Sequence, residues 1–178
     1  MDMRTGKAVL AIVGTFAILA LVHDTLAQVI LFLAWWALML WPLSRAEWIL
    51  AGLTCVGYIA ADIVVTRSGV FTFAAHDVWG LPYYEPLVWG FYFLHAQRLL
   101  RATPPRALRP THTDLLYAGY FIVLGIIIES IGTSEGLWTY HIAHPLVWWI
   151  LTWALSGLIL YRLALPVSVY LARHLHKK

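Results

Sequence analysis

Six apolar stretches dominate the sequence, and they constrain the fold more than any other feature. A helix that crosses the hydrocarbon core of a bilayer needs about 20 mostly apolar residues. Backbone groups in lipid must be hydrogen-bonded within the chain, and the stretches lack the strict alternation of barrel strands, so we expect helices. The predicted spans are 8–21, 27–43, 48–65, 85–99, 115–131 and 145–171, with a bend in the last at Pro166.

Composition excludes several other classes of protein. Hydrophobic residues make up 61% of the 178 positions and charged residues 12%, which is too few charges for an ordinary soluble surface. No polar stretch is long enough to bury a core of its own, so we expect a single membrane domain over 1–178. The only cysteine, Cys55, excludes a disulfide framework and a thiolate metal site. The proline-rich segment 103–110 is predicted to be a semi-extended linker.

The basic residues predict an orientation in the membrane. If all six stretches cross it, eleven of the twelve Lys and Arg residues lie on the side of the N-terminus, and only Arg67 lies opposite. Basic residues concentrate on the cytoplasmic side of membranes. We therefore expect a multi-pass protein of an inner or plasma membrane, with both termini in the cytoplasm. The positions of the basic residues are explained by this orientation in the membrane, so we expect no nucleic-acid partner.

The second half of the bundle contains an internal repeat. In each copy an acidic residue is followed, at offsets of 7, 9 and 11, by a glycine and two aromatic residues. These positions are Asp62, Gly69, Phe71 and Phe73 in the first copy and Glu129, Gly136, Trp138 and Tyr140 in the second. Both copies continue into the tetrapeptide Pro-Leu-Val-Trp, at 86–89 and 145–148.

This repeat predicts how the chain is organised. We expect an N-terminal helix pair over 1–47 and two copies of a helix pair over 48–100 and 113–172. Both copies run in the same direction through the membrane, so their pseudo-twofold axis is expected along the membrane normal. The predicted fold class is an all-α, polytopic bundle of about six transmembrane helices.

Ionisable residues within the predicted spans are the leading candidates for a functional site. Asp62 and Glu129 occupy equivalent positions about one turn from the outer ends of their helices. Instead of a chemical role, either acid could cap its helix or form a hydrogen bond to a neighbouring helix. Glu85 directly precedes Pro86, where the first N–H groups of a helix stabilise a carboxylate, and His144 precedes the proline of the second copy. We expect Glu129 or Asp62 as a proton donor and Glu85 or His144 as a base.

Aromatic residues recur beside these acids. Ten tryptophans are present, and many are expected at membrane interfaces. Ring faces next to a carboxylic acid stabilise a carbocation without adding a nucleophile. The predicted substrate-binding residues are Trp89, Trp138, Tyr140, Trp148, Phe71 and Phe73. Nucleotide-binding and nucleophile motifs are absent and the histidines lack convincing ligand spacing, so we expect neither a cofactor nor a metal.

The segments around both acids resemble a known family. Segments 67–73 (Arg-x-Gly-x-Phe-x-Phe) and 81–85 (Leu-Pro-x-x-Glu) are similar to the membrane-integral lycopene cyclases of the heterodimeric or fused type. Segment 129–140, with its Gly-x-Trp-x-Tyr end, also resembles the related carotenoid hydratase group. Glu85 stands alone where the cyclases usually have an acidic pair. The resemblance implies a cofactor-independent enzyme that protonates an isoprenoid alkene and then quenches the cation.

Several functions fit these features. The leading hypothesis is a proton-initiated cyclase, isomerase or hydratase that acts on a polyisoprenoid lipid within the membrane. An alternative is a non-catalytic binder or transporter of a lipid or small molecule with its site at the outer face, because a duplicated bundle with acids in its helices also suits proton-coupled transport. A structural subunit that binds a partner protein is a third option. The sequence leaves a homo-oligomer and a partner subunit both open.

Overall fold

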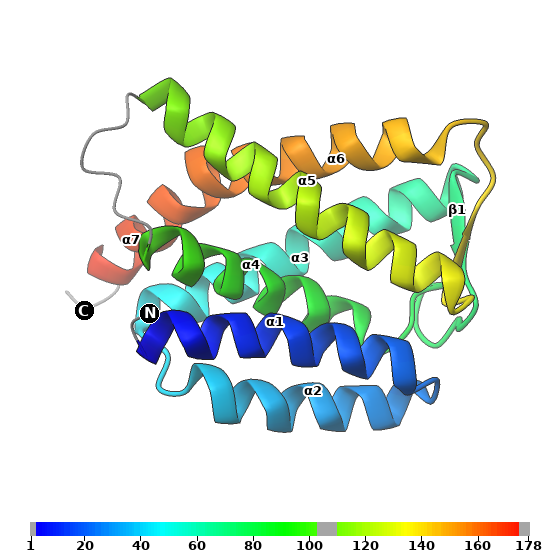
Figure 1. Cartoon of the computed structure of the whole chain (residues 1–178), viewed down its shortest axis with the longest axis horizontal. Coiled ribbons are helices and arrows are strands. Elements are labelled where there is room, and N and C mark those ends of the chain that lie inside the picture. The colour runs from blue at the N-terminus through cyan, green and yellow to red at the C-terminus, as the bar shows by residue number, and fades with distance from the viewer. Residues whose placement is uncertain (1–2, 103–109, 175–178) are drawn as a thin grey trace.

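The chain folds into a bundle of helices that carries two short paired strands at one end (Figure 1). The computed structural model describes residues 3–102 and 110–174, so most of the predicted linker lies outside the described residues. The helices are α1 (Met3–Leu21), α2 (Thr25–Leu40), α3 (Arg45–Arg67), α4 (Glu85–Ala102), α5 (Pro110–Ser134), α6 (Pro145–Ile159), the π-helical turn η1 (Leu160–Ala164) and α7 (Leu165–His174). The strands are β1 (Phe71–Phe73) and β2 (Trp138–Tyr140).

Three of the described helices are long and apolar enough to cross a membrane. They are Arg45–Arg67, His112–Ser134 and the continuous Pro145–His174 that comprises α6, η1 and α7. The helices Gly6–Leu21 and Thr25–Leu40 are apolar but shorter. The mostly helical prediction is therefore confirmed, and these three helices indicate a membrane protein.

Local sequence explains where these helices begin and bend. The Asp24 side chain accepts a hydrogen bond of 2.7 Å from the Ala27 N–H at the start of α2. Ser44 and Glu47 form a reciprocal capping box at the start of α3. The π-helical turn η1 ends two residues before Pro166, whose missing N–H disturbs the regular hydrogen-bond ladder.

Helix α4 lies at the centre of the bundle, between α1 and α3 (Figure 1). The five consecutive residues 92–96 are each at most 1% exposed. Five successive positions cover every side of a helix, so α4 is surrounded by protein at this level. Its polar side chains, including His95, therefore face other helices and avoid the cost of contact with lipid.

Strands β1 and β2 pair antiparallel through equivalent positions of the sequence repeat. Thr72 lies opposite Thr139, which is 67 residues further along the chain, as Glu129 is from Asp62. The flanking aromatic pairs are Phe71 with Tyr140 and Phe73 with Trp138.

Glycines direct the chain from each helix into its strand. Gly69, after α3, has φ +76°, and Gly136, after α5, has φ +68°. Backbone in this region favours glycine, which has no Cβ. The all-α prediction omitted the strands because three residues are too few for alternation to be recognised.

Ion pairs join the helices of each copy at the opposite end of the bundle. Arg98 of α4 donates to Glu47 of α3 at 2.7 Å. Arg162 of η1 donates to Asp114 of α5 at 2.5 Å. Glu47 and Asp114 are again 67 residues apart, so the acids of the two ion pairs occupy equivalent positions of the repeat.

Candidate functional site

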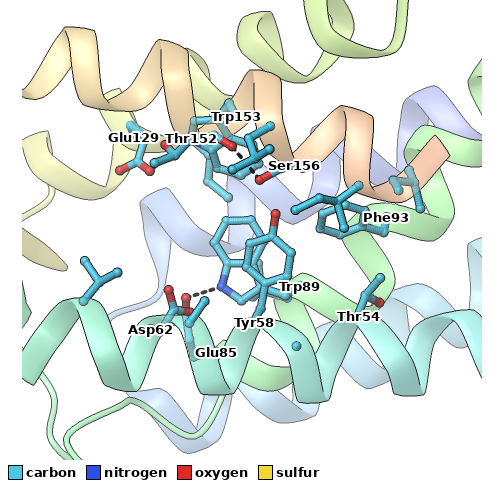
Figure 2. A pocket seen from close by; sticks show the side chains of 18 of the residues that line it. Thr54, Tyr58, Asp62, Glu85, Trp89, Phe93, Glu129, Thr152, Trp153 and Ser156 are labelled. Carbon is cyan, nitrogen blue, oxygen red and sulfur yellow. Dashed lines mark hydrogen bonds between the residues drawn. The ribbon is translucent and has the colours of Figure 1, made fainter. Parts of the chain in front are cut away.

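A cavity of about 590 Å³ lies between the two helix pairs, and it contains all three predicted carboxylic acids. Asp62 comes from α3, Glu85 from the start of α4, and Glu129 from α5. Their exposed fractions are 8%, 4% and 8%. Figure 2 shows Asp62 and Glu85 side by side on one wall and Glu129 across the cavity from them. Acids that are distant in sequence therefore share one sheltered volume.

The structure brings the predicted aromatic residues to the same cavity. All six of them line it: Trp89, Trp138, Tyr140, Trp148, Phe71 and Phe73. His144 does not line it. This histidine is exposed at the N-cap of α6, where its side chain makes no capping hydrogen bond.

The contrast between Glu85 and His144 follows from the positions of their helices. Glu85 begins the central helix α4, whereas α6 lies at the edge of the bundle, where Leu146 and Val147 are both more than half exposed. The prediction of His144 as a base for chemistry in the cavity therefore does not fit its position.

Glu129 is held by three hydrogen-bond donors. Its Oε2 atom accepts from Trp138 Nε1 and from the Tyr140 hydroxyl, both at 2.9 Å. Its Oε1 atom accepts from Trp153 Nε1 at 3.1 Å. A carboxylate offers about four lone-pair sites, so one site remains for a further partner. All three bonds are donated to Glu129, which suits a carboxylate with a fixed orientation.

Two glycines of α5 make room for the indole rings that hold Glu129. A Cβ atom at Gly125 would lie 2.1 Å from Trp153 Cγ, and one at Gly132 would lie 2.0 Å from Trp138 Cζ2. Residues 125, 129 and 132 are spaced by about one helical turn and share a face of α5. The two rings therefore lie against bare backbone on either side of the carboxylate. We call the three donors Trp138, Tyr140 and Trp153 the carboxylate clamp, and the helix itself positions its two indole rings.

Asp62 and Glu85 form a pair of carboxyl groups on the opposite wall. Figure 2 shows the two side chains next to each other and beside the Trp89 indole. Trp89 Nε1 donates to Glu85 Oε1 (Figure 2). Asp62 Oδ2 has no hydrogen-bond partner among the described residues, although it is buried.

Aromatic rings join the two sets of acids. Tyr58 stacks on Trp89 with ring centroids 4.6 Å apart, and Trp153 contacts the same indole at 4.9 Å. Sequence reasoning missed both Tyr58 and Trp153. Neither occupies a matched repeat position, and nothing in the sequence distinguishes Trp153 from an interfacial tryptophan.

Tyr140, the last residue of strand β2, stays a hydrogen-bond donor. Burial, and then the charge of Glu129, raise the pKa of the Tyr140 hydroxyl. The phenol therefore remains protonated at neutral pH and keeps its bond to the carboxylate. Across residues 3–102 and 110–174, no group of three His, Cys, Asp or Glu side chains is arranged to hold a metal ion.

Comparisons with models of protein families, with curated proteins and with solved structures give no significant match to this chain. The site geometry is therefore the main basis for the proposals below.

Proposed function

We propose that the protein is a membrane-embedded, cofactor-independent cyclase, isomerase or hydratase that acts on a polyisoprenoid lipid. The observation that carries this proposal is the convergence of Asp62, Glu85 and Glu129 in one buried cavity lined by aromatic rings. The resemblance of segments 67–85 and 129–140 to lycopene cyclases and carotenoid hydratases supports the same reaction class.

The contacts favour Asp62 as the proton donor. In this proposal Asp62 and Glu85 share one proton, because two adjacent negative charges repel in a medium of low dielectric constant. Glu85 is already engaged by the Trp89 indole. Asp62 Oδ2 is buried and has no hydrogen-bond partner among the described residues. In the proposed first step, Asp62 transfers its proton to one carbon of an alkene. A C–H bond forms from the π electrons, and the neighbouring carbon becomes a carbocation.

Glu129 is proposed to complete the reaction as a carboxylate. Its three donors leave about one lone-pair site open. A second alkene of the substrate attacks the cation, forms a C–C bond and moves the positive charge along the chain. Loss of a proton to Glu129 then gives a cyclic isomer of the substrate. Glu129 releases that proton to solvent, and the acid pair takes up another from solvent, which closes the cycle. Attack by water instead of an alkene would give a hydrated product.

The aromatic lining suits the intermediate between these steps. Trp89, Tyr58 and Trp153 contact one another and line the same cavity as the acid pair and Glu129. Cation–π attraction is worth about 2 kcal/mol or more per ring where water is excluded. Rings lower the energy of a carbocation without offering an atom that quenches it early.

We also propose that all six predicted spans cross the membrane with both termini in the cytoplasm. The chain enters α1 and leaves α7 at the same end of the bundle, and the strands lie at the other end (Figure 1). Of the described basic residues, Lys7, Arg45, Arg98 and Arg162 belong to the parts of their helices nearest the end with the termini. The matched pairing of β1 with β2 supports a pseudo-twofold relation between the two copies. The cavity acids would then lie near the outer face.

The reaction is tested by expressing variants in a bacterial host that accumulates lycopene and analysing its lipids by mass spectrometry. Asp62→Asn and Glu129→Gln keep the size of each side chain and remove its acid function. We expect each to lower the amount of cyclised or hydrated product by about 100-fold or more. Glu135→Gln, an exposed acid at the end of α5, is the matched control and should leave the product unchanged.

Wild-type turnover in both Asp62→Asn and Glu129→Gln would refute the assignment. A bound isoprenoid without any product, in the wild type as well as in the variants, would favour the non-catalytic binder. Transport is less well supported, because the part of the cavity away from the acids is lined by apolar residues such as Leu163 and Val167.

A further inference from the structure

The cavity extends well beyond the acids that the proposed reaction uses. On the side of α6, its lining runs from Trp148 through η1 to Val167 in α7. Nineteen helical residues correspond to roughly 28 Å at 1.5 Å per residue. The acids gather at one end, and the other end is apolar, with Leu160, Leu163 and Ala164. The shape is that of a channel with a polar end and a long apolar tail.

This channel opens sideways between α3 and α6. Helix α3 packs against η1 and α7, whereas α6 packs mainly against α5, so α3 and α6 separate toward the acid end. Figure 2 shows side chains of α3 and α6 facing one another across this gap. Several residues both line the cavity and are exposed at the surface, which identifies the rim. The rim residues are Leu53, Gly57 and Ala61 on α3 and Leu155, Ile159 and Leu163 on α6 and η1.

The opening faces the environment that a lipid occupies. It lies between Arg45–Arg67 and Pro145–His174, two of the three helices that are long and apolar enough to cross a membrane. Its rim carries no charged side chain among the described residues. Hydrocarbon from the bilayer could therefore reach the cavity without passing through water.

We propose that this gap is a lateral portal that admits one end of a linear, apolar lipid chain from the bilayer. The inference rests on the proposed function and specifies its substrate class. The reacting end of the chain lies at Asp62 and Glu129, and the adjoining length fills the apolar channel toward Val167. The remainder of a long chain stays in the bilayer through the open side. A bulky or strongly polar lipid head would not fit this rim.

Gly57 is the best position at which to close the portal. It lies midway along the α3 rim, and a Cβ atom there would have no neighbour within 4 Å. Gly57→Phe therefore places a ring at the rim, and its Cβ atom meets no neighbour. Gly52 provides a matched control, because it is exposed on the same helix, its Cβ would also have no neighbour within 4 Å, and it does not line the cavity.

The test measures binding of lycopene to the purified protein in phosphatidylcholine vesicles. Four tryptophans line the cavity, so quenching of tryptophan fluorescence reports entry of the polyene. We expect Gly57→Phe to weaken binding by about tenfold or more and Gly52→Phe to bind within about twofold of the wild type. Ala61→Phe, one turn further along the rim, should repeat the effect of Gly57→Phe. Circular dichroism and size-exclusion chromatography establish that each variant is folded.

Wild-type binding by folded Gly57→Phe and Ala61→Phe would overturn the portal. Equal loss of binding in Gly52→Phe would also overturn it, because the effect would then not depend on the rim. The reaction is judged separately by product in Asp62→Asn and Glu129→Gln. If the rim variants bind lycopene like the wild type and the acid variants lose product, the portal alone is refuted. If the acid variants keep their product, the reaction is refuted.

Discussion

Replacement of Gly125 by alanine tests whether α5 positions the carboxylate clamp. The new Cβ atom would lie 2.1 Å from Trp153 Cγ, and ordinary contact begins at 3.4 Å, so the ring must move by about 1.3 Å. Such a movement breaks the 3.1 Å hydrogen bond from Trp153 to Glu129. Overpacking costs about 1–3 kcal/mol, and loss of a hydrogen bond to a charged group costs about 1.5–3 kcal/mol.

Alanine also favours the helix by about 1 kcal/mol relative to glycine, which offsets part of this loss. We therefore expect Gly125→Ala to lower the free energy of unfolding by about 1.5–5 kcal/mol. Gly119→Ala is the control on the same helix, because a Cβ atom there meets nothing within 4 Å. It should stabilise the protein slightly. Unfolding is followed by circular dichroism in detergent micelles of fixed composition.

A double-mutant cycle identifies the cause of the loss. In a Trp153→Ala background the ring is absent, so Gly125→Ala should no longer destabilise the protein. The reasoning would be refuted if Gly125→Ala were as stable as Gly119→Ala, or if its penalty persisted without the Trp153 ring.

Three further predictions follow from the loops and strands. Tyr140→Phe removes one donor to the carboxylate and should lower the free energy of unfolding by about 1.5–3 kcal/mol; a variant as stable as the wild type would contradict this role. Gly69→Ala and Gly136→Ala each force a Cβ into a positive-φ backbone and should cost about 1–2 kcal/mol, whereas Gly52→Ala, in a helix, should cost nothing in the same thermal unfolding assay. Because the pKa of Tyr140 is raised in the folded state, its contribution is present at neutral pH and falls as the pH rises above about 10. Stability measured against pH should therefore decline less steeply above pH 10 in Tyr140→Phe, and parallel curves would refute this.

Much of the architecture could be predicted because it depends on patterns that repeat along the chain. The length of the apolar stretches predicted the helices. The matched spacing from Asp62 to Phe73 and from Glu129 to Tyr140 identified residues that meet in the cavity. Matched offsets are informative because equivalent positions in two copies occupy equivalent places in the bundle.

The remaining features depend on contacts that no pattern encodes. Trp153 reaches Glu129 only because Gly125 leaves space on a neighbouring helix, and the sequence shows no link between the two. His144 looked equivalent to Glu85, but α6 lies at the edge of the bundle and α4 at its centre. Helix α4 carries polar residues such as His95 and Gln97, which would be costly in contact with lipid, and only its burial by neighbouring helices accommodates them.

The source of the proton that starts the reaction is the most direct test of the account. The reaction is run in D₂O with purified protein and lycopene, and the product is analysed by mass spectrometry. If Asp62 gives an exchangeable proton to an alkene carbon, the product should gain one carbon-bound deuterium for each ring formed, and Asp62→Asn should form almost no product. Product that lacks deuterium, or labelled product that forms equally well in Asp62→Asn, would contradict the account.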